Sequence, residues 1–396
     1  MTTTTFDYGV FDADNHYYEA TDAYTRYIDP AFAKRTMQWA EIDGKRRLLV
    51  GGKVNRFIPN PLFDPVAKPG SLGEYFRGRN PGSKDIRALF GELEPIRPEY
   101  RDRDARLRVM DEQGLDGCLL FPTLGVGMEE SLADDPPALV AAFTAFNRWL
   151  EDDWGYAYKE RIFAAPMLTL IDLDAAVAEL QRVLDNDARI ICIKAGPAHS
   201  GNELTSPADK RFDRFWGLVN ESGVTVGIHS GDAGYGRYLA DWESPRDFEA
   251  FRGSPLRSML GTDRVPLETM AALVCHGLFD RFPRIRVASI ESGASWVPPL
   301  MKKLKKAYGQ MPGGFASDPV QTAREHIWVA PFYEDDLQRL KEYLGLDHVL
   351  FGSDWPHAEG LTEPRSFAED LARRGYDETE IRTVMAENAR PLVQRL

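Results

Sequence analysis

The chain has 396 residues, of which 43% are hydrophobic and 28% are charged, and this length suits one large α/β domain or two smaller ones. There are 48 lysines and arginines against 61 aspartates and glutamates, so the net charge is −13. This balance disfavours a nucleic-acid backbone or an anionic membrane as a partner, because either would need a basic patch.

Cysteine usage and the first residues bear on the compartment. The three cysteines, Cys118, Cys192 and Cys275, lie in apolar runs and predict buried, reduced thiols, not disulfides. Residues 1–7 have no basic region and no apolar core, so no signal peptide is expected. No apolar run approaches transmembrane length. We therefore expect a cytoplasmic protein.

The first motif is Phe11-Asp12-Ala13-Asp14-Asn15-His16, which ends a short apolar approach that predicts the first β-strand. Side chains alternate between the two faces of a strand, so Asp14 and His16 point the same way. A carboxylate and an imidazole side by side can grip one divalent cation. The alternative is a turn cap at Asp14 and a satisfied surface histidine at His16.

Residues 17 to about 100 are irregular and rich in proline and glycine. Within them, residues 36–54 predict a β-hairpin around Asp43-Gly44, a strong turn pair. We interpret residues from about 20 to 100 as an insertion after the first strand, within a single domain that spans residues 1–396.

From about residue 100, strands and helices alternate. The further predicted strands are short apolar runs at residues 117–121, 162–168, 190–194, 224–229, 285–291, 326–330 and 348–352. The predicted helices cover residues 101–113, 137–158, 173–184, 212–222, 266–282, 296–308, 335–344, 367–374 and 378–388. Eight strands, each followed by a helix, are typical of a (β/α)8 TIM barrel. A doubly wound open sheet gives the same alternation, but the count of eight and the placement of polar residues favour the barrel.

Ionisable residues follow several of these strands where each apolar run ends, which is the end that carries the active site in such barrels. They are Asp14 and His16, Lys194 with His199 in the next loop, His229, Glu291, and Asp354 with His357. Charged groups are costly at a barrel rim unless they are paired or bound to metal. Four or five of them at the same end of different strands predict one convergent site.

The order of these motifs resembles the amidohydrolase superfamily, through the Asp14–His16 pair, His229 on strand five and Phe351-Gly352-Ser353-Asp354 on strand eight. Residues 279–287 (Phe-Asp-Arg-Phe-Pro-Arg-Ile-Arg-Val) resemble the branch related to aminocarboxymuconate-semialdehyde decarboxylase, called amidohydrolase family 2. The resemblance covers nearly the whole chain. It implies one divalent metal ion held by Asp14, His16, His229 and Asp354.

The chain departs from the family pattern at two positions. The first member of the strand-one pair is usually histidine and is Asp14 here, although some aromatic-acid decarboxylases of the branch carry Glu-x-His. The strand-six position is usually histidine and is Glu291 here. The resulting ligand set is rich in oxygen. Mn²⁺ and Mg²⁺ therefore suit this set better than they would suit an all-histidine site, and Zn²⁺ remains an alternative.

Three other ionisable residues have open roles. In binuclear members of the superfamily a carboxylated strand-four lysine bridges two metals; for Lys194 we favour contact with a substrate carboxylate or pairing with an acid. His276 lies in an apolar helix and is expected to be a core histidine. His357 is either a donor to substrate or a partner of a metal ligand.

These observations predict a metal-dependent decarboxylase (a lyase) or hydrolase that acts on a small carboxylated or aromatic compound, with Glu291, Asp354 and His357 as catalytic residues. The alternative is a degenerate, non-catalytic barrel that binds a ligand or partner, which the substitutions at Asp14 and Glu291 make worth testing. We expect a homodimer.

Overall fold

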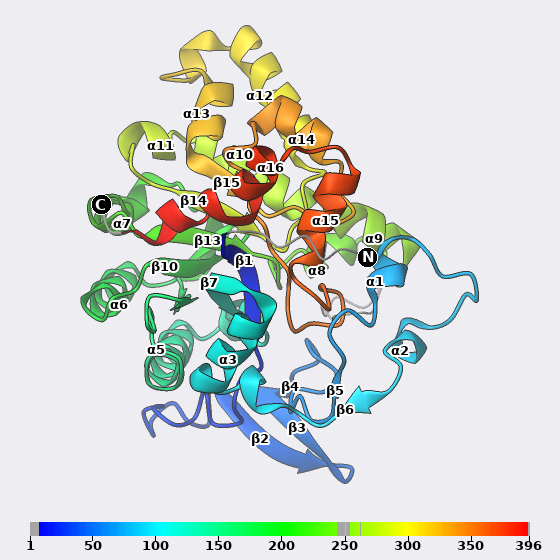
Figure 1. The fold of residues 1–396 in the computed structure, drawn as a ribbon. Helices are drawn as coiled ribbons and strands as arrows, with labels where there is room; N and C mark the ends of the chain where they lie inside the picture. Colours follow the sequence, from blue (N-terminus) through cyan, green and yellow to red (C-terminus); the bar gives the residue numbers. More distant parts are fainter. Residues whose placement is uncertain (1–7, 244–249, 251–253, 262, 395–396) are drawn as a thin grey trace.

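The computed structural model describes residues 8–243, 250, 254–261 and 263–394 of the chain (Figure 1). Strands gather at the centre and helices surround them. Among the described residues, no helix is both long enough and apolar enough to cross a membrane.

The central strands are parallel and follow chain order. One sheet has the order β1 (Val10–Tyr17), β7 (Leu115–Pro122) and β8 (Ile162–Ala164). The next has the order β9 (Met167–Leu168), β10 (Ile190–Lys194), β13 (Thr225–His229), β14 (Val287–Ile290) and β15 (Ile327–Val329). The predicted third strand is therefore divided into β8 and β9. Residues Ala165 and Pro166 between them still bond to both neighbouring strands, through Ala165 N to Leu120 O and Cys192 N to Pro166 O.

The predicted eighth strand closes the barrel without forming a regular ladder. It is held by isolated bridges, Val349 to Val329 on one side and Trp355 to Asn15 on the other. The backbone N–H of Ala13 also donates to Phe351 O at 2.7 Å. The first and last strand positions are thus joined, which excludes the open-sheet alternative.

The longer helices lie outside the strands (Figure 1). They are α3 (Arg103–Gln113), α5 (Pro136–Asp153), α6 (Leu173–Asp185), α7 (Asp213–Ser222), α10 (Arg264–Cys275), α12 (Val297–Gln310), α13 (Pro319–His326), α14 (Leu337–Leu344) and α15 (Ser366–Arg373), and the short helix α16 (Glu378–Arg382) follows them. Most agree with the predicted helices to within a few residues. Several begin at an aspartate whose side chain accepts a hydrogen bond from the first turn, as Asp102 does for α3.

The prediction of one continuous helix over residues 266–282 is wrong. The structure has two helices there, α10 and α11 (Leu278–Arg281), because Gly277 adopts a left-handed conformation with φ 66°. The segment before α10, expected to be a loop, contains the short helices α8 (Gly236–Leu239) and α9 (Pro255–Gly261).

Between β1 and α3 the chain forms the expected hairpin, β2 (Met37–Ile42) and β3 (Lys45–Val50), drawn in blue at the bottom of Figure 1. Asp43 and Gly44 have φ values of 53° and 68°, as a two-residue hairpin turn requires. The other short elements of this region are β4 (Lys53–Val54), β5 (Val66–Ala67), α1 (Gly73–Phe76), α2 (Ile86–Leu89) and β6 (Leu93–Glu94).

Two expectations about burial are wrong. Cys118 and Cys192 are buried, but Cys275 is exposed at the end of α10. His276, expected in the core, is also exposed and its Nδ1 contacts Ser206 Oγ at 2.7 Å. Both residues lie where α10 ends, so the apolar stripe of the helix stops before them.

Asp12 joins the first strand to the eighth strand position. Its fully buried carboxylate accepts hydrogen bonds from Ser353 N at 2.9 Å, Ser353 Oγ at 2.5 Å, Asn15 Nδ2 at 2.9 Å and Asp14 N at 3.1 Å. One carboxylate therefore satisfies four donors at the place where the ladder is irregular.

Replacing Asp12 with alanine is expected to lower the free energy of unfolding by about 3 kcal/mol or more, because four buried donors lose their acceptor. Urea denaturation followed by circular dichroism measures the change. Glu41→Ala, which removes an exposed carboxylate on β2, is the control and should change stability by less than about 0.5 kcal/mol. Equal stability of the two variants would contradict this account of barrel closure.

Candidate metal centre

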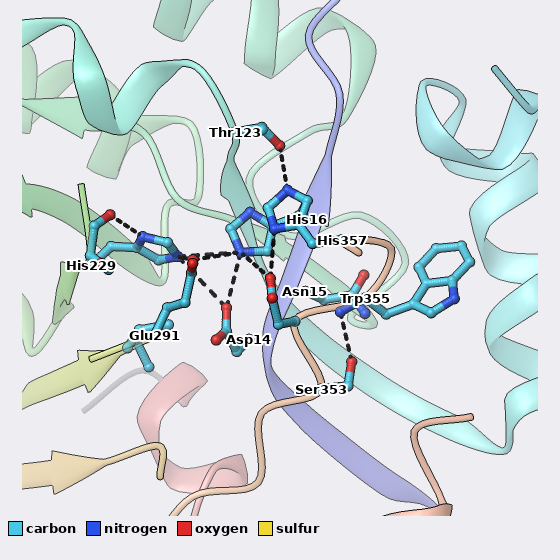
Figure 2. A network of polar contacts seen from close by, with 12 residues as sticks. Asp14, Asn15, His16, Thr123, His229, Glu291, Ser353, Trp355 and His357 are labelled. Atoms are coloured by element: carbon cyan, nitrogen blue, oxygen red, sulfur yellow. Dashed lines mark hydrogen bonds and ion pairs between the residues drawn. The ribbon is translucent and has the colours of Figure 1, made fainter. Parts of the chain in front are cut away.

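Ionisable side chains from four strand positions meet at one end of the barrel (Figure 2). His16 Nε2 lies 3.1 Å from Asp14 Oδ1, 3.4 Å from Asp354 Oδ1 and 3.5 Å from Glu291 Oε2. His229 Nε2 lies 3.2 Å from Glu291 Oε2 and 3.3 Å from His16 Nε2. All the residues predicted from the strand ends as metal ligands are therefore brought together, and Glu291 joins them.

The local backbone directs these side chains inward. Asp14 and His16 lie on the same side of β1, and His229 is the last residue of β13. Glu291 and Asp354 follow β14 and the eighth strand position with φ values of 49° and 55°, a left-handed conformation that is uncommon for residues other than glycine. In each case the chain turns sharply where the strand ends.

Gly352 allows the eighth strand position to approach the first one closely. A Cβ atom at this position would lie 2.6 Å from the Cβ of Asp14. A side chain at residue 352 would therefore displace Asp14 from the other ligands.

The separations fit a single bound divalent cation. Two atoms that each lie about 2.1 Å from an ion are at most about 4.2 Å apart, and the distances above lie within that limit. Two overlapping groups of atoms have the required proximity: one is Asp14, His16, His229 and Glu291, and the other is His16, Glu291, Asp354 and His357.

The protonation of His229 also fits a metal ligand. His229 Nδ1 lies 2.7 Å from Ser230 O, a carbonyl that can only accept, so Nδ1 carries the proton. In the neutral imidazole, Nε2 then carries the lone pair that faces the centre of the cluster.

The charge of the cluster favours a cation. Asp14, Glu291 and Asp354 are close together and, among the described residues, form ion pairs with histidines but not with lysine or arginine. Burial lowers the pKa of His16, but hydrogen bonds and charge from Asp14 and Glu291 outweigh it and raise the pKa to about 10. In the metal-free site, His16 is therefore the cation among the carboxylates.

His357 contacts Asp354 and Thr123 with its two ring nitrogens. Nδ1 lies 2.6 Å from Asp354 Oδ1, and Nε2 lies 2.9 Å from Thr123 Oγ1. The Thr123 hydroxyl donates its only proton to Tyr17 O at 2.8 Å, so Oγ1 accepts from His357 Nε2. If that proton is the only one on the ring, Nδ1 is an acceptor, and the short contact to Asp354 needs one further proton.

Electrostatics assign that proton to Asp354 in the metal-free protein. Burial, followed by the charges of Glu291 and Glu359, holds the pKa of Asp354 well above its usual range. Burial, followed by the charges of His16 and His229, holds the pKa of His357 well below its usual range. Electrostatics thus favour a protonated Asp354 and a neutral His357, a state that the hydrogen-bond geometry accommodates.

Lys194 and His199 belong to a separate cluster around Glu130. Lys194 Nζ and His199 Nε2 lie 2.9 Å and 2.8 Å from Glu130 Oε1. Burial raises the pKa of Glu130, but His199 and Lys194 outweigh it and bring the pKa to about 2. Of the three roles considered for Lys194, the structure supports pairing with an acid.

Sequence reasoning missed four residues near these clusters: Thr123, Glu129, Glu130 and Glu359. Three of them follow β7, with Glu129 and Glu130 at the start of the short helix α4 (Glu129–Leu132), and Glu359 follows the eighth strand position. The sequence signal that could have found them is the ionisable and hydroxyl residues in the segments just after the strands, beyond the strand-end residues themselves.

Known proteins resemble the chain in sequence and fold. The family model described as Amidohydrolase matches residues 65–395. A gamma-resorcylate decarboxylase from Rhizobium sp. (strain MTP-10005) is 24% identical over 285 residues, which are 67% of this chain and 82% of that protein.

Two solved structures extend the comparison. An amidohydrolase from Mycobacterium avium subsp. paratuberculosis K-10 has a TM-score of 0.92 and 41% identity, covering 98% of this chain and 100% of that one. A dihydroxybenzoic acid decarboxylase from Polaromonas sp. JS666, with bound manganese and the inhibitor 2-nitroresorcinol, has a TM-score of 0.58 and 18% identity, covering 86% of this chain and 95% of that one. The second likeness concerns the fold.

His16→Ala is expected to reduce bound Mn²⁺ from about one ion per chain to almost none, because it removes the nitrogen that all three carboxylates face. Metal analysis after dialysis measures the loss, and circular dichroism should show that the barrel remains folded. His276→Ala, an exposed histidine away from the site, is the control. An unchanged Mn²⁺ content in His16→Ala would remove this residue from the ligand set.

Gly352→Ala should weaken Mn²⁺ binding at least about tenfold, because the added Cβ displaces Asp14. Calorimetric titration with Mn²⁺ gives the affinity. Gly309→Ala is the matched control, since a Cβ atom there has no neighbour within 4 Å. The same affinity in both variants would show that the position of Asp14 does not control binding.

Proposed function

The chain belongs to the amidohydrolase family, and on that basis we propose that it is a metal-dependent enzyme that removes the carboxyl group of a small aromatic acid as carbon dioxide. The decarboxylases among its relatives support this reaction. The observation that carries the proposal is the 2.6 Å contact between Asp354 Oδ1 and His357 Nδ1, beside carboxylates and imidazoles arranged to hold a cation.

We assign the metal-binding role to Asp14, His16, His229 and Asp354. When bound, the ion supplies Lewis-acid polarisation of substrate oxygen atoms. The abundance of carboxylate oxygens favours Mn²⁺ or Mg²⁺ over Zn²⁺, and the manganese in the Polaromonas relative supports Mn²⁺.

The reaction needs a proton at a defined place. Cleavage of the bond between the ring carbon and the carboxylate leaves the electron pair on that carbon, which must then take up a proton as carbon dioxide departs. We propose that Asp354 Oδ1 donates it. His357 positions this carboxyl group through Nδ1, and Thr123 fixes the orientation of the imidazole through Nε2.

Glu291 is the second residue to which we assign a role in proton transfer. Its Oε2 lies within 3.5 Å of both His16 Nε2 and His229 Nε2, and its side chain is about one-quarter exposed, more than those of the other carboxylates in the cluster. It can therefore meet the substrate and exchange a proton with it. It occupies the strand-six position where the family usually has histidine.

We also propose that the chain is one domain over residues 1–396, with residues from about 20 to 100 as an insertion beside the site. Two backbone hydrogen bonds support the second point, from Gly70 N to His357 O at 3.0 Å and from Leu72 N to Ala358 O at 2.7 Å. The homodimer and the cytoplasmic location remain predictions from the sequence.

The function is tested by incubating Mn²⁺-loaded protein with a panel of hydroxybenzoic acids, including 2,6-dihydroxybenzoate, and measuring carbon dioxide release. Release is expected from at least one acid and should stop after removal of the metal by a chelator. Hydrolysis of lactones or amides in place of carbon dioxide release would favour the hydrolase alternative. No turnover of either kind would favour a non-catalytic barrel.

Glu291→Gln should lower kcat at least about a hundredfold while leaving the melting temperature and Mn²⁺ content almost unchanged, because the amide keeps the shape but cannot carry the proton. Carbon dioxide release at saturating substrate measures kcat. Glu41→Gln, on the exposed face of β2, is the control. Normal turnover by Glu291→Gln would leave proton transfer to Asp354 and His357 alone.

A further inference from the structure

A second polar site borders His229. A small cavity there is lined by His229 itself, Lys194, Glu129 and Asp232. It has room for about one water-sized group. Because His229 also belongs to the candidate metal centre, the two sites share a wall.

Glu129 is the unusual member of this cavity. It is only 4% exposed, and its Oε2 has no hydrogen-bond partner among the described residues. A buried carboxylate oxygen without a donor is costly, since it has lost water and gained nothing in exchange. Because Glu129 lines the cavity, a hydrogen-bond donor for this oxygen must be either a group bound in the cavity or a group of the surrounding protein.

Lys194, the basic residue that lines the cavity, is already bonded to other residues. Lys194 Nζ pairs with Glu130 Oε1 at 2.9 Å and donates to Pro197 O at 2.8 Å. Its charge still acts on Glu129: burial raises the pKa of Glu129, and Lys194 and His199 oppose the rise. The lysine therefore favours an ionised Glu129 without donating to its free oxygen.

The opposite wall is held rigidly. Asp232 N donates to Val126 O at 3.1 Å, and Asp232 Oδ1 accepts from Gly234 N at 2.9 Å. A Cβ atom at Gly231 would lie 2.4 Å from Val126 O, so only glycine permits this approach of the loop after β13. Asp232 is thus fixed in the cavity wall with one oxygen already bonded.

We propose that Glu129 and Asp232 form a subsite that binds a hydrogen-bond donor on the substrate, a ring hydroxyl or amino group remote from the carboxylate that reacts. This inference rests on the proposed function, because it places the reacting carboxylate at the metal centre. It narrows the substrate class to aromatic acids that carry such a second donor. A hydrophobic substituent of the same size would leave Glu129 Oε2 without a partner.

The test compares the binding of matched ligands to Mn²⁺-loaded protein by calorimetry. The reference is 2-hydroxybenzoate, and the probes are its 4- and 5-hydroxy derivatives together with the corresponding methyl derivatives. At least one hydroxy derivative should bind about tenfold tighter than both the reference and its methyl counterpart. In Glu129→Leu this gain should disappear while the affinity for 2-hydroxybenzoate is unchanged.

Glu129→Gln serves as the second variant, because it keeps an acceptor oxygen and the shape of the side chain; it should retain part of the gain. Glu41→Gln should retain all of it. A gain that survives in Glu129→Leu, or no gain at any ring position in the unmodified protein, would overturn the subsite, and so would a complete lack of binding.

Binding and turnover separate the two proposals. Carbon dioxide release without any preference for the second donor would overturn the subsite and leave the proposed function standing. A preference that depends on Glu129, without carbon dioxide release from any acid, would support the subsite and overturn the decarboxylase.

Discussion

The seam between β1 and the eighth strand position determines the geometry of the candidate metal centre. Across it, Ala13 N donates to Phe351 O, Asp354 N to Asp14 O and His16 N to Trp355 O, at 2.7 to 2.8 Å. These bonds fix the backbone on both sides of three metal-binding candidates. Because the eighth position has no regular ladder, Asp12 supplies the missing order by accepting from Ser353 and Asn15. A small shift of this seam would move the strand-one and strand-eight ligands relative to each other.

The same seam is supported from the other side of β1 by Arg106, which is fully buried on α3. Its guanidinium donates to the side chain of Asn15 and, at 2.7 Å, to His16 O, and it lies 4.6 Å from the centre of the Trp355 ring. Arg106 donates to uncharged acceptors and, among the described residues, forms no ion pair with the carboxylates of the site. The cluster around His16 can therefore remain anionic, which is the condition that favours a divalent ion.

His229 connects the two parts of the site. Its Nε2 faces the carboxylates, while its ring forms part of the wall of the cavity that contains Glu129. The two sides have different chemistry. The side with the carboxylates can hold a cation and a proton donor, whereas the cavity side offers acceptor oxygens next to Lys194, which is already paired with Glu130. In our proposal, an aromatic acid with a second donor group is complementary to both sides, and His229 at the end of β13 borders both.

The sequence by itself determined the alternation of strands and helices, the hairpin at Asp43-Gly44 and the positions of Asp14, His16, His229, Glu291 and Asp354. Each of these depends on a local signal: the spacing of apolar residues, an apolar run that ends in an ionisable residue, or a turn pair. Only the tertiary structure decided the pairing of Glu130 with Lys194, the contact of His357 with Thr123 and the free oxygen of Glu129. These residues are distant in sequence, and their partners follow from how the loops pack over the barrel. The exposure of Cys275 and the irregular eighth strand likewise depend on neighbours from other elements, because burial and strand pairing are properties of the packed chain and not of a segment.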